Sequence, residues 1–142
     1  MGWPTANEGL EERIVEIRRR DRRFARNAYF FILDCLDFTM QTLGRDRKTG
    51  AERHVGGREL LEGIKEMAAE HFGPMAAAVF QRWGIQRTED FGEIVFNLID
   101  CGLLTRRPED SRLDFAGGYD FEQTFAELFR ERIATISYPN QG

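Results

Sequence analysis

The sequence predicts an α+β fold that is mostly α-helical, with five to six helices and one β-hairpin. Apolar residues recur at three- and four-residue steps over most of the chain, which is the spacing of one face of a helix. Three of these periodic stretches are followed directly by a glycine, as is usual at helix ends: Gly73, Gly84 and Gly102. Residues 103–115 differ, because two short stretches flank Pro108 and a polar turn, a pattern typical of a β-hairpin.

Three helices are expected in the first half of the chain. They cover residues 8–19, residues 21–43 and residues 58–72, and each has a stripe of apolar side chains. Asp21 is the expected N-cap of the second helix, because its carboxylate can accept a hydrogen bond from the first helical turn. A polar loop, residues 44–53, joins the second helix to the third.

The second half is expected to contain three more helices and the hairpin. A short helix follows Pro74, and a longer one covers residues 89–101 with Thr88 as its N-cap. After the hairpin, Asp120 caps a final helix. Because three helices followed by a hairpin outline a winged helix-turn-helix, residues 57–116 are predicted to form a winged-helix-like half.

The chain is expected to form one globular domain over residues 9–136, between flexible tails at residues 1–8 and 137–142. No apolar stretch approaches the ~18 residues that a membrane-spanning helix needs. The first residues lack the charged and apolar regions of a secretory signal. We therefore expect a cytoplasmic protein with no membrane partner.

Charge is distributed unevenly along the chain, although the formal net charge is only −4. Residues 13–26 are rich in arginine, whereas the region after Thr88 is mainly acidic. Because clustered arginines can neutralise phosphates, the candidate phosphate contacts are Arg18, Arg19, Arg22, Arg23, Arg26, Arg106 and Arg107. The alternative is a solvated helix face on which these arginines form ion pairs with neighbouring acids.

The helix expected at residues 89–101 would take the position of the DNA-reading helix of a winged helix. Its polar positions are mostly acidic and it contains no basic residue, so it would repel a phosphate backbone. We therefore expect a basic protein partner, attracted by charge complementarity, with candidate contacts at Glu89, Asp90, Glu93, Asn97, Asp110 and Asp114. The alternative is an acidic surface that is only hydrated.

The final helix is expected to be strongly apolar. Phe121, Phe125, Leu128 and Phe129 are spaced to share one face, and Ile133 and Ile136 follow. Most of this face should pack on the core. Apolar surface that stays exposed there would mark a partner interface or a homodimer interface.

No catalytic apparatus can be recognised in the sequence. The two histidines, His54 and His71, and the two cysteines, Cys35 and Cys101, lack the spacing of a metal site or of a nucleophilic triad. We therefore expect no catalytic residue, no metal and no cofactor. A small-molecule or enzymatic site is a third alternative, and it would require a deep pocket that holds a histidine beside a carboxylate.

Several motifs, in the same order along the chain, resemble one protein family over about residues 13–125. They are His54-Val-Gly-Gly-Arg-Glu-Leu-Leu-Glu-Gly-Ile, Phe72-Gly-Pro-Met-Ala, Trp83-Gly-Ile, Glu89-Asp-Phe-Gly-Glu-Ile-Val-Phe-Asn-Leu and Gly118-Tyr-Asp-Phe-Glu. The family is an uncharacterised bacterial family restricted to planctomycetes and verrucomicrobia, in which a Ser is common where this chain has Gly56. The resemblance implies no activity, substrate or site.

The sequence therefore favours a non-enzymatic protein-interaction module that uses the acidic helix and the hairpin. The alternative from another class is a nucleic-acid-associated, winged-helix-like regulator that uses the arginine cluster. Arginines gathered beside the hairpin on one surface would favour the regulator. Arginines dispersed into ion pairs would count against it.

Overall fold

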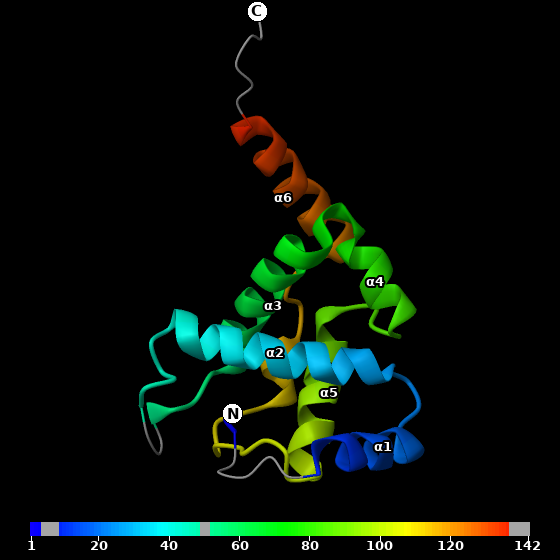
Figure 1. Ribbon diagram of the computed structural model, residues 1–142, viewed down its shortest axis with the longest axis vertical. Helices are drawn as coiled ribbons and strands as arrows, with labels where there is room; N and C mark the ends of the chain where they lie inside the picture. The colour runs from blue at the N-terminus through cyan, green and yellow to red at the C-terminus, as the bar shows by residue number, and fades with distance from the viewer. Residues whose placement is uncertain (4–8, 49–51, 137–142) are drawn as a thin grey trace, which may run out of the picture.

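The computed structural model describes residues 1–3, 9–48 and 52–136, and the regular structure of these ranges is helical (Figure 1). In these ranges, the six α-helices and two short 3₁₀ helices with assigned bounds follow one another as α1 (Leu10–Arg20), α2 (Arg26–Thr42), α3 (Gly57–Phe72), η2 (Gly73–Met75), α4 (Ala76–Arg82), α5 (Thr88–Asp100), η3 (Arg112–Phe115) and α6 (Phe121–Thr135). Within the same ranges, no helix combines the length and the apolar character that crossing a membrane requires.

The predicted β-hairpin, and with it the α+β class, is wrong. In the described part of the chain no strand forms, and the one β-bridge is an isolated antiparallel pair between Gly2 and Thr105. The residues expected to return as a second strand form η3 instead. The Ser111 side chain accepts a hydrogen bond from the backbone N–H of Leu113 (3.2 Å), and the Asp114 carboxylate accepts one from the backbone N–H of Ser111 (3.1 Å). Such local side-chain bonds compete with strand pairing for the same backbone groups, so a winged-helix half is not supported.

Two predicted helix starts have different outcomes. Asp120 caps α6 as expected, because its carboxylate accepts a hydrogen bond from the backbone N–H of Gln123 (2.8 Å). Asp21 does not cap α2, which begins only at Arg26 after Ala25. The Asp21 carboxylate instead accepts hydrogen bonds from Arg23 in the loop between α1 and α2.

The core is centred on Phe80 of α4, whose side chain is fully buried. Its ring centroid lies 5.2 Å from that of Phe91 on α5, 5.1 Å from that of Phe121 and 5.9 Å from that of Phe125, both on α6. Phe31 of α2 lies 6.0 Å away on another side. Aromatic pairs at such separations stabilise a fold by about 0.5–1.5 kcal/mol each beyond the burial of their surface. Four helices therefore meet at this cluster.

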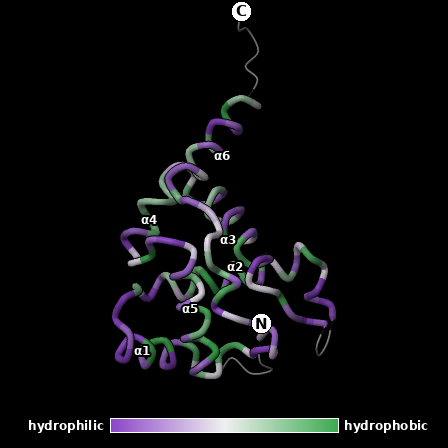
Figure 2. The backbone as a smooth tube through the Cα atoms, turned by 180° about the vertical axis from the view of Figure 1, so that it is seen from behind, coloured by the Kyte–Doolittle hydropathy of each residue, from purple (hydrophilic) through white to green (hydrophobic). Residues whose placement is uncertain are grey.

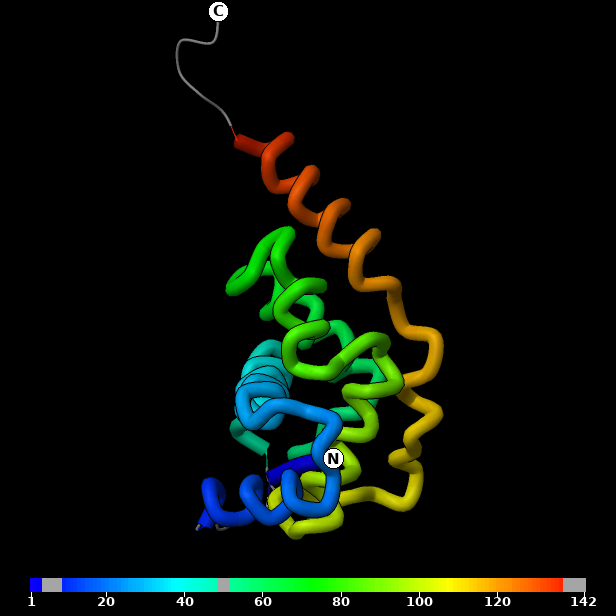
Figure 3. Tube along the Cα trace, turned by 90° about the vertical axis from the view of Figure 1, so that its right-hand side faces the viewer, coloured from blue at the N-terminus to red at the C-terminus, as the bar shows by residue number. Residues whose placement is uncertain are grey.

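The helices are arranged along one long axis. α2 lies across α3 and also contacts α5, while α1 packs on α2 and α5 at one end (Figure 1). α6 packs against η2 and α4. The helix then continues away from the body at the other end of the molecule, as the side view shows (Figure 3). The tube coloured by hydropathy shows apolar residues on this extension as well as in the body (Figure 2).

The crossing of α2 over α3 depends on Gly63. A Cβ atom at this position would overlap the hydroxyl oxygen of Thr39, which is itself buried and donates a hydrogen bond to the carbonyl of Cys35 (2.7 Å). The backbone of α3 can approach α2 this closely only because residue 63 has no side chain.

Gly63→Ala is expected to lower the free energy of unfolding by about 2 kcal/mol, because the added methyl group overpacks the crossing. Thr39→Ala in the same chain should recover part of that loss by removing the oxygen that is overlapped. Urea unfolding followed by circular dichroism measures both. Helix propensity alone would raise the free energy of unfolding of Gly63→Ala by about 1 kcal/mol. Such an increase would contradict the close crossing.

Candidate functional site

The acidic residues of α5 lie close to the loop between α1 and α2. Asn97 donates hydrogen bonds from its side-chain amide to the Asp21 carboxylate (3.0 Å) and to the Tyr29 hydroxyl (3.1 Å). The Asp21 carboxylate also accepts hydrogen bonds from the Arg23 side chain, the shortest at 2.7 Å. These Arg23 hydrogen bonds are the main reason that the pKa of Asp21 lies well below its usual range, with a smaller contribution from Asn97 and with burial acting in the opposite direction. Asn97 thus ties α5 to the loop and to α2.

The other acidic side chains expected to bind a partner also have contacts within the chain. The Glu93 carboxylate lies 3.6 Å from the Arg23 guanidinium and 2.8 Å from that of Arg112. Asp90 accepts a hydrogen bond from the backbone N–H of Gln86 (2.8 Å), and Glu89 accepts one from that of Gly117 (3.5 Å). A basic partner would have to compete with these groups.

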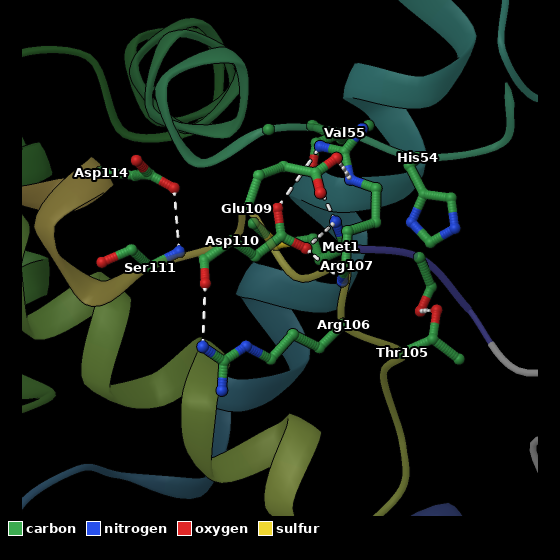
Figure 4. Close-up of polar contacts among 12 residues, drawn as sticks. Met1, His54, Val55, Thr105, Arg106, Arg107, Glu109, Asp110, Ser111 and Asp114 are labelled. Atoms are coloured by element: carbon green, nitrogen blue, oxygen red, sulfur yellow. Dashed lines mark hydrogen bonds and ion pairs between the residues drawn. The ribbon is translucent and has the colours of Figure 1, made fainter. Parts of the chain in front are cut away.

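Asp110 is the most buried member of the predicted acidic surface, with 3% of its area exposed. Its carboxylate pairs with the N-terminal ammonium group of Met1 (2.8 Å) and accepts hydrogen bonds from the backbone N–H (2.8 Å) and the guanidinium (3.3 Å) of Arg107 (Figure 4). The ammonium group also donates to the carbonyl of Val55 (2.9 Å). Asp114 lies apart and binds the backbone of Ser111. Asp110 is thus placed to hold the structure together and is not accessible to a partner.

Burial by itself would raise the pKa of Asp110, but the hydrogen bonds from the Met1 ammonium group and from the Arg107 backbone outweigh it and lower this pKa. Burial lowers the pKa of the Met1 amino group, and the hydrogen bond to Asp110 opposes that effect. The two shifts differ in meaning: the charge of Asp110 is fully compensated for its removal from water, whereas the charge of the Met1 ammonium group is compensated only in part.

The arginines predicted to contact phosphate are dispersed. Arg19 lies 3.5 Å from Glu16, Arg23 binds Asp21, and the Arg26 guanidinium pairs with Glu11. Arg18 donates to the carbonyl of Phe24 (3.2 Å), and Arg22 is exposed. Arg106 stacks over the Phe96 ring, 5.2 Å from its centroid, and Arg107 binds Asp110. Because most of these charges are engaged within the chain, the arrangement counts against a surface built for phosphates, and phosphate binding stays a prediction.

The two histidines lie in different shallow depressions. His71 is exposed and lines a depression of about 620 Å³ with Glu66 and Glu70, beside the end of α3. His54 lines another, of about 470 Å³, with Arg45 and Glu59. Both are open to solvent, so neither provides the deep pocket that the enzymatic alternative requires. In the described ranges no three or more His, Cys, Asp or Glu side chains gather closely enough to hold a metal ion.

Exposed large apolar side chains of the described chain are concentrated on the second half of α6 and just beyond it. Phe125 is buried, but the same face continues with Phe129 (40% exposed), Ile133 (49%) and Ile136 (51%). Large patches of exposed apolar surface on a monomer are often functional. We call Phe129, Ile133 and Ile136 the α6 stripe. The sequence indicated that an interface could form here, but it could not show where burial stops.

A groove runs beside the α6 stripe, between it and the corner formed by the end of α3 and η2. Its volume is about 180 Å³, and small residues form its floor on the side of that corner: Ala69, Gly73 and Pro74. The Arg132 guanidinium crosses between the helices, donating to the carbonyl of Ala69 and to the Glu70 carboxylate (both 3.1 Å). The depression that contains His71 begins on the other side of this bridge and shares Ala69, Glu70, Leu128 and Arg132 with the groove.

Comparison of the chain with protein-family models, with curated proteins and with solved structures gives no match. The resemblance to the planctomycete and verrucomicrobial family therefore stays a prediction. Any functional conclusion has to rest on the geometry of the chain itself.

Asp110→Asn is expected to lower the free energy of unfolding by about 3 kcal/mol, because it leaves the buried Met1 ammonium group without its counter-ion. Chemical unfolding measures the loss. Glu109→Gln is the matched control, since the Glu109 side chain is 65% exposed and should change stability little. Equal stability of the two variants would show that the buried pair contributes nothing.

The low pKa of Asp21 makes a pH-dependent contribution to stability. Because this carboxyl group binds protons less readily in the folded chain, its contribution is present above the unfolded pKa of ~3.9 and is lost as the pH falls toward the folded pKa. Asp21→Asn should therefore be less stable at neutral pH, by about 1–3 kcal/mol, and should lose less stability than the native chain on acidification. Thermal unfolding from neutral to acid pH tests this, with the exposed Asp100→Asn as control. Parallel curves for the native chain and Asp21→Asn would contradict it.

Proposed function

We propose that the chain is a non-enzymatic protein-interaction module and that the α6 stripe is its contact surface. The observation that carries the proposal is the continuation of the buried apolar face of α6 beyond the body, where Phe129, Ile133 and Ile136 are 40–51% exposed. Taking such a side chain from full exposure to full burial contributes about 1.5–3 kcal/mol, so covering the exposed half contributes roughly half of that for each residue. A soluble fold gains nothing from leaving three of them in water on one face.

The interaction surface expected from the sequence is less suited to this role. Its acidic groups on α5 have partners within the chain, and Asp110 is buried. The hairpin that would have completed that surface does not form in the described residues. The α6 stripe, by contrast, lies beside an apolar groove and has apolar groups free to be buried.

Site-specific photo-crosslinking tests the proposal. With Phe129 replaced by photoreactive benzoylphenylalanine, illumination of cells that make the protein is expected to give one saturable protein adduct, identified by mass spectrometry. Ile133→Asp in the same chain should suppress this adduct, because a carboxylate at the centre of an apolar interface would be desolvated.

The matched control places the same photoreactive residue at position 113. Leu113 is even more exposed than Phe129, at 77%, but it lies on η3. Adducts that are equally abundant from the two positions, or that are insensitive to Ile133→Asp, would mark non-specific contact and would contradict the assignment of this surface.

A further inference from the structure

We propose that the partner of the α6 stripe is a second copy of this chain, with the Phe129 side chain of each copy seated in the groove of the other. This inference rests on the proposed function, since it names the occupant of the same surface. It is argued from the fit of the groove, from the area that a dimer needs and from charge.

The groove accepts one aromatic ring. Its volume is about 180 Å³ and its lining is mainly apolar, and a dry apolar cavity of about 150 Å³ is known to bind benzene. Phe129, which is 40% exposed, is one of the residues that line the same groove, so its ring is open to solvent there. A projecting group and a matching hollow on one surface are what a two-fold symmetric interface requires, because each copy then both inserts and receives.

The exposed area of the α6 stripe is too small for a stable dimer in which only the two stripes touch, so the interface has to include surface beyond them. A whole aromatic side chain offers roughly 150–250 Å², so three half-exposed side chains offer on the order of 300 Å². A standard stable interface buries ~800 Å² on each partner. The groove adds little to this area, because Phe129, Ile133 and Ile136 are among the residues that line it. The remainder has to come from Met75 of η2, which is 60% exposed, from the adjoining depression beyond the Arg132–Glu70 bridge and from the polar surface around the stripe.

Charges around this surface offer one complementary pair. Among the described residues, Arg130 on α6 and Glu66 on α3 are two opposite charges that make no ion pair within the chain, whereas their neighbours Arg132 and Glu70 pair with each other. Glu66 lines the depression that adjoins the groove. A copy whose Phe129 enters the groove carries Arg130, the next residue, toward this acidic edge. The two otherwise unpaired groups can then meet across the interface, once on each side of the two-fold axis.

Sedimentation equilibrium of the purified full chain, from micromolar to millimolar concentration, tests the proposal. The native chain is expected to form a dimer, and Phe129→Glu should raise the dissociation constant roughly tenfold or more, as for the loss of a central anchor residue. Val15→Glu on α1 is the matched control, since Val15 is also 47% exposed but lies at the other end of the molecule, and it should dimerise like the native chain. Unchanged circular dichroism would show that both variants are folded.

Exchanging the charges tests the arrangement. Glu66→Arg and Arg130→Glu should each weaken the dimer, and the chain that carries both substitutions should recover it. Failure of the double variant to recover would overturn the arrangement with Arg130 opposite Glu66.

Other outcomes separate this inference from the proposed function. A native chain that stays monomeric throughout, or a dimer that Phe129→Glu leaves intact, would overturn the second copy as partner. If the crosslinker at position 129 still captured one different protein that Ile133→Asp abolishes, the interaction function would stand without self-association.

Discussion

The packing of Phe80 against the rings of α2, α5 and α6 is the contact on which the arrangement of the chain depends. α4 is only two turns long, so its own hydrogen bonds could not hold it in place in water. Its ring gives four helices a common centre, and the paired rings of Phe121 and Phe125 fix the direction in which α6 leaves the body. The position of the α6 stripe follows from this anchoring, because the anchored half determines where the apolar face of the second half points.

The helices could largely be predicted from the sequence, and the reason is local. The apolar periodicity of α3 and the glycine that follows it are contained within the segment itself, as is the hydrogen bond from Gln123 to Asp120 that begins α6. Where a side chain has a distant partner, sequence patterns gave the wrong structure. Asp21 has the chemistry of an N-cap, but Arg23 and Asn97 bind it, and Asn97 lies 76 residues away. The hairpin failed for a local and a distant reason: Ser111 and Asp114 form the capping bonds of η3, and the pattern around Pro108 does not show that Asp110 will be buried against Met1.

In the candidate site, too, some features are visible in the sequence and others depend on contacts between distant residues. That α6 ends in an apolar stretch is visible in the sequence, whereas the point at which its burial ends depends on the length of α3 and on the turn at η2. Acidic residues on α5 are equally visible, but the sequence does not show which basic side chains face them in the folded chain. Arg112 opposite Glu93 and Arg23 opposite Asp21 convert much of an expected interaction surface into internal ion pairs. A sequence therefore shows less about which charges stay free for a partner than about which faces of a helix are apolar.

The Met1 ammonium group and the Gly2–Thr105 bridge join the first residues of the chain to a segment more than 100 residues further on. Contacts of such long sequence separation can form only after the intervening chain has become compact, because the entropy of closing the loop is lost before the contacts are gained. We therefore expect the helical body to assemble first and the first three residues to attach to it afterwards. Substitutions in this attachment should act mainly on the rate of unfolding, while those around Phe80 should slow folding itself. The contacts of the first three residues are thus expected to set the lifetime of the folded state rather than the rate at which it forms.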